Sequence, residues 1–422
     1  MKKTRTLRFA SYVVAAAVAV YASEIAPAIA PTVAAATPSA TPTPNKSLVT
    51  ATPTASQTPD TSFPTASPTA SQVQAAVKPA SRALGSIITT LSLDKQMLGV
   101  ATDSAKGVLV AAGSDVVTLF DLVNDTVLSR IQGGVGANPT GVGLVVVVDS
   151  GVGHAFVARY DDNSVSMIDT GTGSFLRRIV AGHGPSSLTV DATRHRLYVT
   201  NFLDNTVSVV DTRSGAGLKT IKVGQSPVSM GVDTQAKRAF VANYADNTVT
   251  VIDTTNLVTR TTVVVDAGPN AVGVDEKTGR VFVADFDAAT TTMLNSTTGA
   301  VLKRVSVGVS PTTVSVNTAG GQVLVANYFS NTVSVLSATT GAVLYTVPVG
   351  TFPVSIGLDA AIGYAFVADT GSNDVTVLDL THRKVLRRVN AGVGPSSVAV
   401  DPKTGVAAVA NGTIGAVALL NG

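Results

Sequence analysis

The stretch YVTNFLDNTVSVVDT occupies residues 198–212, and close copies of it stand 42 positions away on either side. The earlier copy reads FVARYDDNSVSMIDT at residues 156–170, and the later copy reads FVANYADNTVTVIDT at residues 240–254. In each copy two runs rich in Val and Ile flank a turn that contains Asp and Asn, which is typical of an antiparallel hairpin. Recurrence at one fixed spacing of this length indicates a repeat architecture.

Each repeat divides into four short runs bounded by turn residues. The copy that begins at Ser187 reads SLTVD, RLYVTN, NTVSVVD and GLKTIKV, with no helical period. Each repeat is therefore expected to form a four-stranded antiparallel sheet. A single sheet would expose Val and Ile on both faces, and each such side chain gains about 1.5–3 kcal/mol on burial. The sheets must stack, and the fold class predicted is all-β, a β-propeller of four-stranded antiparallel blades.

The number of blades follows from the end of the first run, which is Asp or Asn in eight copies. The eighth copy has only three strands before the chain stops at Gly422, and a spare strand, GSIITTLSL, stands upstream at residues 85–93. Joining this strand to the last blade would close the ring and leave no unpaired edge there. We predict eight blades, or seven if the divergent first copy forms none of its own. The eight residues are Asp103, Asp149, Asp191, Asp233, Asp275, Asn317, Asp359 and Asp401.

These motifs resemble a known family. YVTN followed by NTVSVVDT, and then Val-Gly-x-x-Pro, is similar to the YVTN family of β-propeller repeats, which occurs in exported and surface-layer proteins of bacteria and archaea. The resemblance covers about residues 84–422 and is strongest over residues 156–400. The first and eighth copies lack the aromatic residue and the Asp-Asn turn. The resemblance implies a fold and an exported protein far more than it implies an activity.

The N-terminal residues have the form of a secretory signal peptide. A basic start at residues 2–8 precedes the apolar run FASYVVAAAVAVYA at residues 9–22, which is short for a membrane span. We expect residues 1–28 to be removed, with Ala22, Ala28 and Ala36 as the candidate cleavage positions, so the mature chain would have no transmembrane span. The expected location is extracytoplasmic: secreted, on the cell surface or in the periplasm.

Residues 29–83 are rich in Ala, Thr, Ser and Pro and contain almost no large apolar side chains. Such a segment cannot bury enough surface to fold, so we expect a disordered linker. The propeller domain is expected over residues 84–422.

Composition limits the partners. The 422 residues include no Cys, which excludes disulfides, thiolate metal ligands, covalently bound c-type haem and a lipoprotein anchor. The formal net charge is +3, but removal of residues 1–28 leaves 26 basic and 26 acidic side chains. A neutral mature chain has no overall charge that would attract nucleic acid, so we do not expect that partner.

Basic residues occur in adjacent pairs in the fourth strands. These strands are outermost in a propeller blade, where positive charge prevents another molecule from adding a strand. Because side chains alternate along a strand, one member of each pair is expected to face a neighbouring blade. The pairs are Arg177 with Arg178, Lys303 with Arg304, and Arg387 with Arg388.

Two other recurring positions are assigned to the scaffold. The Asp that ends a first or third strand should accept hydrogen bonds from the turn it precedes. Each connection between blades contains a Pro, and a Gly stands three residues earlier in six of seven copies, where a positive φ is the expected reason. The seven are Pro139, Pro185, Pro227, Pro269, Pro311, Pro353 and Pro395.

The candidate binding residues lie where the copies differ. The turn after the second strand should share a face with the connection between blades, and loops on one rigid face are common binding sites. Arg, Asn and Asp replace one another at the end of the second strand, and an aromatic residue often follows. Either they form a polar recognition rim, or the polar side chain caps its hairpin and the ring packs between blades. The candidates are Arg159, Tyr160, His183, Asn201, Asn243, Tyr244, Asp285, Asn327, Tyr328, Asp369 and Asn411.

No group of residues in the sequence indicates a reaction. Of the four His, only His183 belongs to the expected binding face, so no metal site is predicted. Glu276 would be the single Glu of the mature chain, Trp is absent, and no nucleotide-binding or nucleophile motif opens a helix. We predict no catalytic residues and no cofactor.

Two functions from different classes remain. The favoured one is a non-catalytic, monomeric binding or scaffold module that recognises a protein or a cell-envelope polysaccharide. The alternative is an extracytoplasmic lyase, hydrolase or oxidoreductase that uses Asp285, Asp369, His183 and Arg159. At least two of these four side chains would have to converge near the axis of the propeller.

Overall fold

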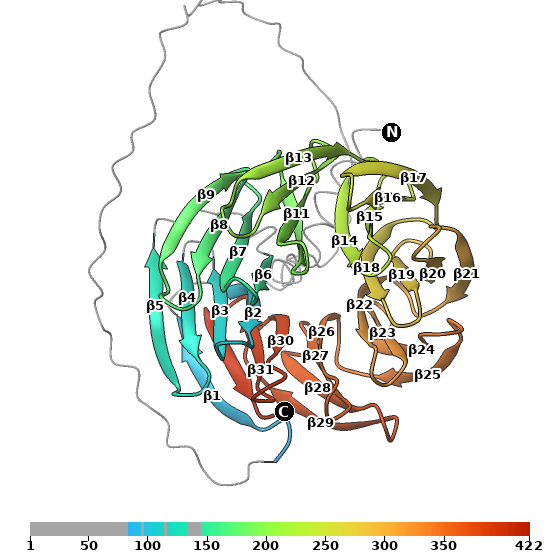
Figure 1. Ribbon diagram of the computed structural model, residues 1–422. Helices are drawn as coiled ribbons and strands as arrows, with labels where there is room; N and C mark the ends of the chain where they lie inside the picture. The colour runs from blue at the N-terminus through green and yellow to red at the C-terminus, as the bar shows by residue number, and fades with distance from the viewer. Residues whose placement is uncertain (1–82, 94–96, 114–115, 133–144) are drawn as a thin grey trace, which may run out of the picture.

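The computed structural model describes residues 83–93, 97–113, 116–132 and 145–422. In these residues it shows 32 strands in eight four-stranded antiparallel sheets. The sheets are blades arranged in a ring, with the first strand of each repeat innermost (Figure 1). The predicted eight-bladed β-propeller is confirmed. The segments expected to be a signal peptide (residues 1–28) and a linker (residues 29–83) lie, except for residue 83, outside the described residues.

The first four blades follow one another along the chain. The first contains β2 (Met97–Asp103), β3 (Val108–Gly113), β4 (Val116–Asp121) and β5 (Thr126–Gln132). The second contains β6 (Val146–Asp149), β7 (His154–Arg159), β8 (Ser164–Asp169) and β9 (Phe175–Val180). The third contains β10 (Pro185–Asp191), β11 (Arg196–Asn201), β12 (Thr206–Asp211) and β13 (Gly217–Lys222). The fourth contains β14 (Pro227–Asp233), β15 (Arg238–Asn243), β16 (Thr248–Asp253) and β17 (Val258–Val264).

The remaining blades continue the pattern until the last. The fifth contains β18 (Pro269–Asp275), β19 (Arg280–Asp285), β20 (Thr290–Asn295) and β21 (Val301–Ser306). The sixth contains β22 (Pro311–Asn317), β23 (Gln322–Asn327), β24 (Thr332–Ser337) and β25 (Val343–Pro348). The seventh contains β26 (Pro353–Asp359), β27 (Tyr364–Asp369), β28 (Asp374–Asp379) and β29 (Lys384–Asn390). The eighth contains β30 (Pro395–Val400), β31 (Ala407–Asn411), β32 (Ala416–Leu420) and, from the start of the domain, β1 (Ile87–Ser92).

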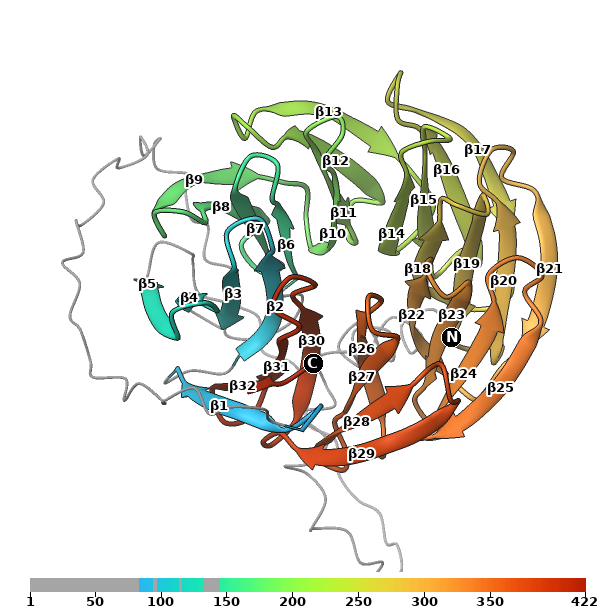
Figure 2. The ribbon, with the colours of Figure 1, turned by 60° about the horizontal axis from the view of Figure 1, so that its bottom comes forward.

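The ring is closed by β1. This strand pairs antiparallel with β32, with Thr89 opposite Leu419 and Ser92 opposite Ala416. The innermost strand of the eighth blade, β30, contacts β2 of the first blade (Figure 2). The closing strand predicted at residues 85–93 is therefore confirmed, and β1 is the outermost strand of the eighth blade.

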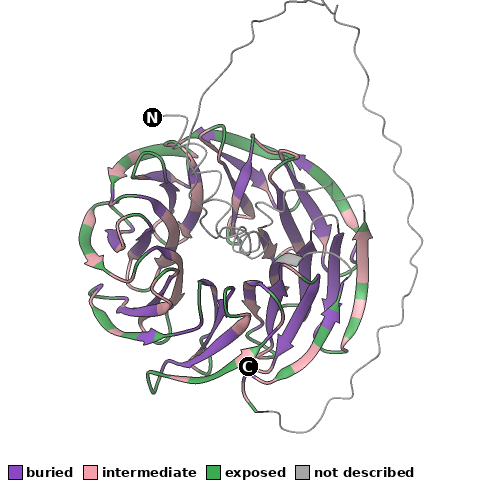
Figure 3. Cartoon of the chain, turned by 180° about the vertical axis from the view of Figure 1, so that it is seen from behind, coloured by how far each residue is buried: buried purple, intermediate pink, exposed green. Residues whose placement is uncertain are grey.

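The core lies between neighbouring blades and is made mostly of Val, Leu, Ile and Ala. Between the third and fourth blades, for example, Tyr198 and Val209 pack with Val241 and Ile252. The middle strands of the blades are buried and the outermost strands are largely exposed (Figure 3). Stacking therefore buries both faces of each blade, as the Val-rich composition requires.

The predicted role of Asp in the turns is confirmed. Asp169 at the end of β8 accepts hydrogen bonds from the backbone N–H groups of Gly171 and Thr172 at 2.7 and 2.8 Å. Asp149 at the end of β6 accepts one from the N–H of Gly151 at 3.1 Å. The backbone N–H groups of each turn thus bind the carboxylate that precedes the turn.

The positive φ predicted for the Gly of the connections is present at Gly392, at φ 120°, but not at Gly182, Gly224, Gly308 or Gly350. In those four connections the residue directly before the Pro has the positive φ instead. A Cβ atom at Gly182 would lie 2.7 Å from the side-chain amide of Asn201, and one at Gly224 would lie 2.7 Å from that of Asn243. Gly is needed here because the end of the second strand packs directly against the connection.

The basic pairs differ from prediction in one respect. All six side chains are exposed. In two of the three pairs both members reach a neighbouring blade instead of one, whereas Arg178 bonds to Asp162 of its own blade. Arg387 donates to the carbonyl of Leu84, beside the eighth blade, and Arg388 donates to the carbonyl of Val349, in the connection from the sixth. The long side chains lie along the outer surface of the ring. The alternation of side chains along a strand therefore does not place one member of each pair between two blades.

Candidate functional site

One face of the propeller combines the two kinds of loop named above. The N–H of His183, in a connection, donates to Oδ2 of Asp204, in a turn after a second strand, at 2.7 Å. The N–H of Val309 likewise donates to Oγ of Ser330 at 2.7 Å. We call this the linker face. It comprises the connections 181–184, 223–226, 265–268, 307–310, 349–352 and 391–394, and the turns 160–163, 202–205, 244–247, 286–289, 328–331, 370–373 and 412–415.

The polar residues at the ends of the second strands do not reach the surface of this face. The amide Nδ2 of Asn201 donates to the hydroxyls of Thr206 and Ser208, both at 2.9 Å, and its Oδ1 accepts from the N–H of Gly182 at 3.1 Å. Asn243 makes the same two side-chain bonds, to Thr248 and Thr250. The set is 0–1% exposed, so these side chains cap hairpins and do not form a recognition rim; its members are Arg159, Asn201, Asn243, Asp285, Asn327, Asp369 and Asn411.

Two of these caps are carboxyls. Burial raises the pKa of Asp285 to about 7, and Asp266 nearby adds to the rise. Burial likewise raises the pKa of Asp369 to about 7, with Asp374 adding to it. Thr292 donates to Asp285 at 2.7 Å and Thr376 donates to Asp369, each within its own blade. A raised pKa is also common at catalytic carboxyls, so the surroundings of these two groups decide their role.

Those surroundings do not support an enzyme at this position. Asp285, Asp369 and Arg159 lie in the fifth, seventh and second blades, and each has its charged or hydroxyl partner within its own blade. His183 is 67% exposed, and its Nδ1 lies 2.8 Å from Oδ1 of Asp204. The four residues of the enzyme hypothesis are thus not brought together.

The strands nearest the axis offer no alternative group. Before their terminal Asp or Asn, the described innermost strands contain no ionisable side chain. Their hydroxyls bind neighbouring strands instead, since Thr313 and Ser315 donate to the carbonyls of Val354 and Ile356 at 2.7 and 2.9 Å. General acid–base chemistry near the axis has no candidate there.

Arg159 shows how the scaffold accommodates a charge at a capping position. It is 1% exposed, and its Nε donates to Oδ2 of Asp162 at 3.0 Å. The hydroxyls of Ser164 and Ser166 stand where the Asn of other blades finds its partners, and neither has a hydrogen-bond partner here. A buried guanidinium of this kind depends on the carboxylate beside it.

Replacing Asp162 tests this dependence. Asp162→Ala is expected to lower the free energy of unfolding by about 1–3 kcal/mol, because the buried Arg159 loses its carboxylate. Arg159→Asn in the same background should recover part of that loss, since Asn can donate to Ser164 and Ser166. Urea denaturation of these variants, with the exposed Asp161→Ala as a control, would measure both effects; no recovery in the double variant would contradict the account.

The aromatic candidates are placed differently from one another. Tyr244 is nearly buried and donates to Asp287 at 2.8 Å, and Tyr160 lies 6.5 Å from Phe202 between centroids. Tyr328 belongs to a cluster of three rings that the sequence did not reveal, with Phe329 beside it and Phe352 from the next connection. Phe329 is 53% exposed and Phe352 is 38% exposed. We call Tyr328, Phe329 and Phe352 the aromatic patch.

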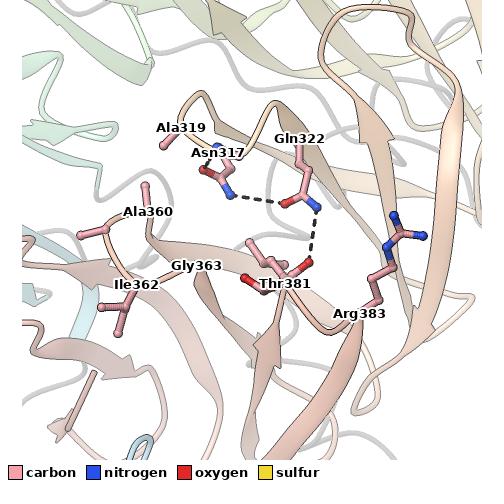
Figure 4. A pocket seen from close by; sticks show the side chains of 11 residues that line it. Asn317, Ala319, Gln322, Ala360, Ile362, Gly363, Thr381 and Arg383 are labelled. Atoms are coloured by element: carbon pink, nitrogen blue, oxygen red, sulfur yellow. Dashed lines mark hydrogen bonds between the residues drawn. The ribbon is translucent and has the colours of Figure 1, made fainter.

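The opposite face carries a shallow groove of about 420 Å³ between the sixth and seventh blades (Figure 4). Nδ2 of Asn317 donates to Oε1 of Gln322 at 3.3 Å, and Arg383 lies over the ring of Tyr345 at 5.5 Å from its centroid. Most of its lining is neutral and small, from Ala319 to Gly363. The groove holds no pair of acid and base groups.

The described residues lack two kinds of feature. They contain no group of three or more His, Cys, Asp or Glu side chains placed to hold a metal ion. Within the same residues, no helix is long and apolar enough to cross a membrane.

Comparison with known proteins agrees with the fold. No protein-family model and no curated protein matches the sequence. Among solved structures, hydrazine synthase of Kuenenia stuttgartiensis is similar with a TM-score of 0.55 and 19% sequence identity, over 64% of this chain and 92% of that chain. At this identity the likeness concerns the fold alone, and the class that the fold and comparison define is the β-propeller.

Proposed function

We propose that the chain is an exported, YVTN-type β-propeller that acts as a non-catalytic binding or scaffold module. In this proposal the signal peptide at residues 1–28 directs export, and residues 29–83 hold the propeller away from a surface as a linker. The monomeric propeller then recognises a protein or an envelope polysaccharide through its linker face.

The aromatic patch is the observation that carries the proposal. Exposed rings that lie together on a face of rigid loops are characteristic of binding sites, because aromatic side chains give large contact areas at a small cost in entropy. Of the ionisable groups of the enzyme hypothesis, Arg159, Asp285 and Asp369 are instead buried in separate blades, and His183 is exposed. Of the predicted binding residues, His183, Tyr160 and Tyr328 retain a place on this surface, and the seven capping residues act by shaping its loops.

Co-sedimentation with envelope material from the host tests the proposed function. The wild-type chain is expected to pellet. For the variant Phe329→Ala with Phe352→Ser, the fraction of protein that remains in the supernatant is expected to be at least several times larger than for the wild type. Ile362→Ser, in the groove of the opposite face, serves as the matched control and should pellet like the wild type. Equal behaviour of all three proteins would count against the linker face as the binding site.

A further inference from the structure

Phe352 has a backbone conformation that is unusual for its side chain. It stands directly before Pro353 at φ 57°, in the left-handed region that bulky side chains avoid. The equivalent residues in the other described connections also have positive φ, but they are Gly or Ser: Gly184, Ser226, Gly268, Ser310 and Gly394. A large ring at this position strains the backbone, and strain of this kind concentrates where residues serve a function.

The geometry of the patch keeps this ring on the surface. Phe352 stacks on Tyr328 with centroids 4.8 Å apart and an interplanar angle of 14°. Phe329 stands edge-on to both rings, at 81° and 89°, with centroids 4.9 and 6.2 Å away. Gly371 of the next blade makes room for the stack, since a Cβ atom there would lie 2.4 Å from Cδ2 of Phe352. The three rings thus form one ordered platform that is open to a partner.

The charged side chains of the linker-face loops are all acidic. The described loops of the linker face contain six Asp and no Lys or Arg: Asp161, Asp162, Asp204, Asp246, Asp266 and Asp287. Arg178 and Arg304 of the outer strands approach two of them, Asp162 at 3.7 Å and Asp266 at 2.9 Å.

Two carboxylates in the blades before and after that of Tyr328 accept hydrogen bonds from neutral donors. Asp287 in the fifth blade accepts from the hydroxyl of Tyr244, and Asp374 in the seventh accepts from that of Ser372 at 2.6 Å. Asp374 also borders the connection that carries Phe352, because a Cβ atom at Gly350 would lie 2.5 Å from its Oδ1. A carboxylate with a neutral donor thus stands in the blade on each side of Tyr328, while Arg388 brings one positive charge to the connection that carries Phe352.

We propose that the aromatic patch, with Asp287 and Asp374, binds a cationic segment of a protein partner, with Arg or Lys side chains placed over the rings. This rests on the proposed function and names the partner class of the same face. Ring faces attract cations, and complementary charge selects the partner and speeds its association. An anionic envelope polysaccharide would be repelled by the same carboxylates.

Fluorescence anisotropy with the full chain and labelled nona-arginine tests the proposal. A nona-citrulline peptide, which has nearly the same shape without the charge, is the matched ligand, and a neutral β-glucan and polygalacturonate represent polysaccharides. Nona-arginine is expected to bind, with an affinity that falls as salt rises, and the other three ligands much more weakly. Phe329→Ala with Phe352→Ser should weaken nona-arginine binding about fivefold or more.

Two further variants separate the contributions. Asp287→Asn with Asp374→Asn should also weaken binding and flatten its dependence on salt. Leu203→Ala, an exposed residue of the same face in the third blade, should change nothing. Thermal unfolding shows whether each variant is folded, and Phe352→Ser is expected to fold well because Ser stands at this position in two other blades.

The outcomes distinguish this inference from the proposed function. Binding of nona-arginine that is equal in all variants, or no stronger than that of nona-citrulline, would overturn the inference. Binding of a polysaccharide that the ring variant abolishes would also overturn it while leaving the linker face as a binding site. If no ligand binds and envelope co-sedimentation is unchanged by the ring variant, both proposals fail.

Discussion

A chain that begins at residue 94 is expected to unfold under conditions in which a chain that begins at residue 83 remains folded. The eleven residues between the two starts include β1, and their loss leaves β32 as an unpaired edge. It also uncovers Leu91 and Leu93, which are 4% and 2% exposed and belong to a core cluster shared with the first blade. Lost burial and pairing together should cost about 5 kcal/mol or more.

Urea denaturation and size-exclusion chromatography of the two chains would measure this loss. The shorter chain is expected to unfold at lower urea and to associate through its open edge. Leu91→Ala in the longer chain isolates the contribution of packing and should cost about 2–5 kcal/mol. If the shorter chain is a monomer of unchanged stability, β1 does not close the ring.

The fold was predictable because the same local signals recur in every blade. Eight first strands end in Asp or Asn, and all eight are strands in the structure, including the divergent first one. The spare strand at residues 85–93 could be assigned because three strands in the last copy require a fourth. Repetition thus made the order and the number of blades readable from spacing alone.

The candidate site was less predictable, because the sequence does not show whether the last residue of a strand points outward or between blades. The sequence left Asn201 and Asp285 open as members of a rim or as hairpin caps, and both are buried caps. A signal was present: a hydroxyl residue stands five and seven positions after each of them, as in Thr206 and Ser208, and these hydroxyls are their partners.

The aromatic patch could not be found from repeat positions considered singly. Phe329 and Phe352 come from different loops, 23 residues apart, and meet Tyr328 only in the folded ring. The one local signal was a Phe directly before Pro353, where the other described copies have Gly or Ser. Its meaning depends on the backbone φ at that residue, which the sequence does not give.

The variant Asp285→Asn with Asp369→Asn is expected to be more stable than the wild type at pH 8 by several kcal/mol. Burial raises the pKa of both carboxyls from 3.8 to about 7. Each rise corresponds to a difference of about 4 kcal/mol between the free energy of unfolding with that carboxyl protonated and with it ionised. A group whose pKa is higher in the folded state than in the unfolded state contributes its full stability to the fold at pH values below its unfolded pKa. That stability is then lost as the pH rises from about 4 to about 7.

Other carboxyls act in the opposite direction at lower pH. The N–H groups of the turns lower the pKa of Asp169 and Asp253, against the effect of burial, so the stability they give is lost as the pH falls below 3.8. The wild type should therefore be most stable near pH 4–5 and should weaken towards pH 8. Because Asn replaces the two buried carboxyls at positions where Asn201, Asn243 and Asn327 already fit, the variant should keep its stability as the pH rises.

Urea midpoints at pH 4.5, 6 and 8 would measure the difference between the two proteins. The midpoints are expected to agree closely at pH 4.5 and to separate progressively up to pH 8. Asn327→Asp is the matched control, because it adds a third buried carboxyl at an equivalent position and should make the loss towards pH 8 steeper. If the wild type and the double variant keep parallel midpoints at all three pH values, the two buried carboxyls are already ionised in the folded propeller, and their burial does not govern its stability.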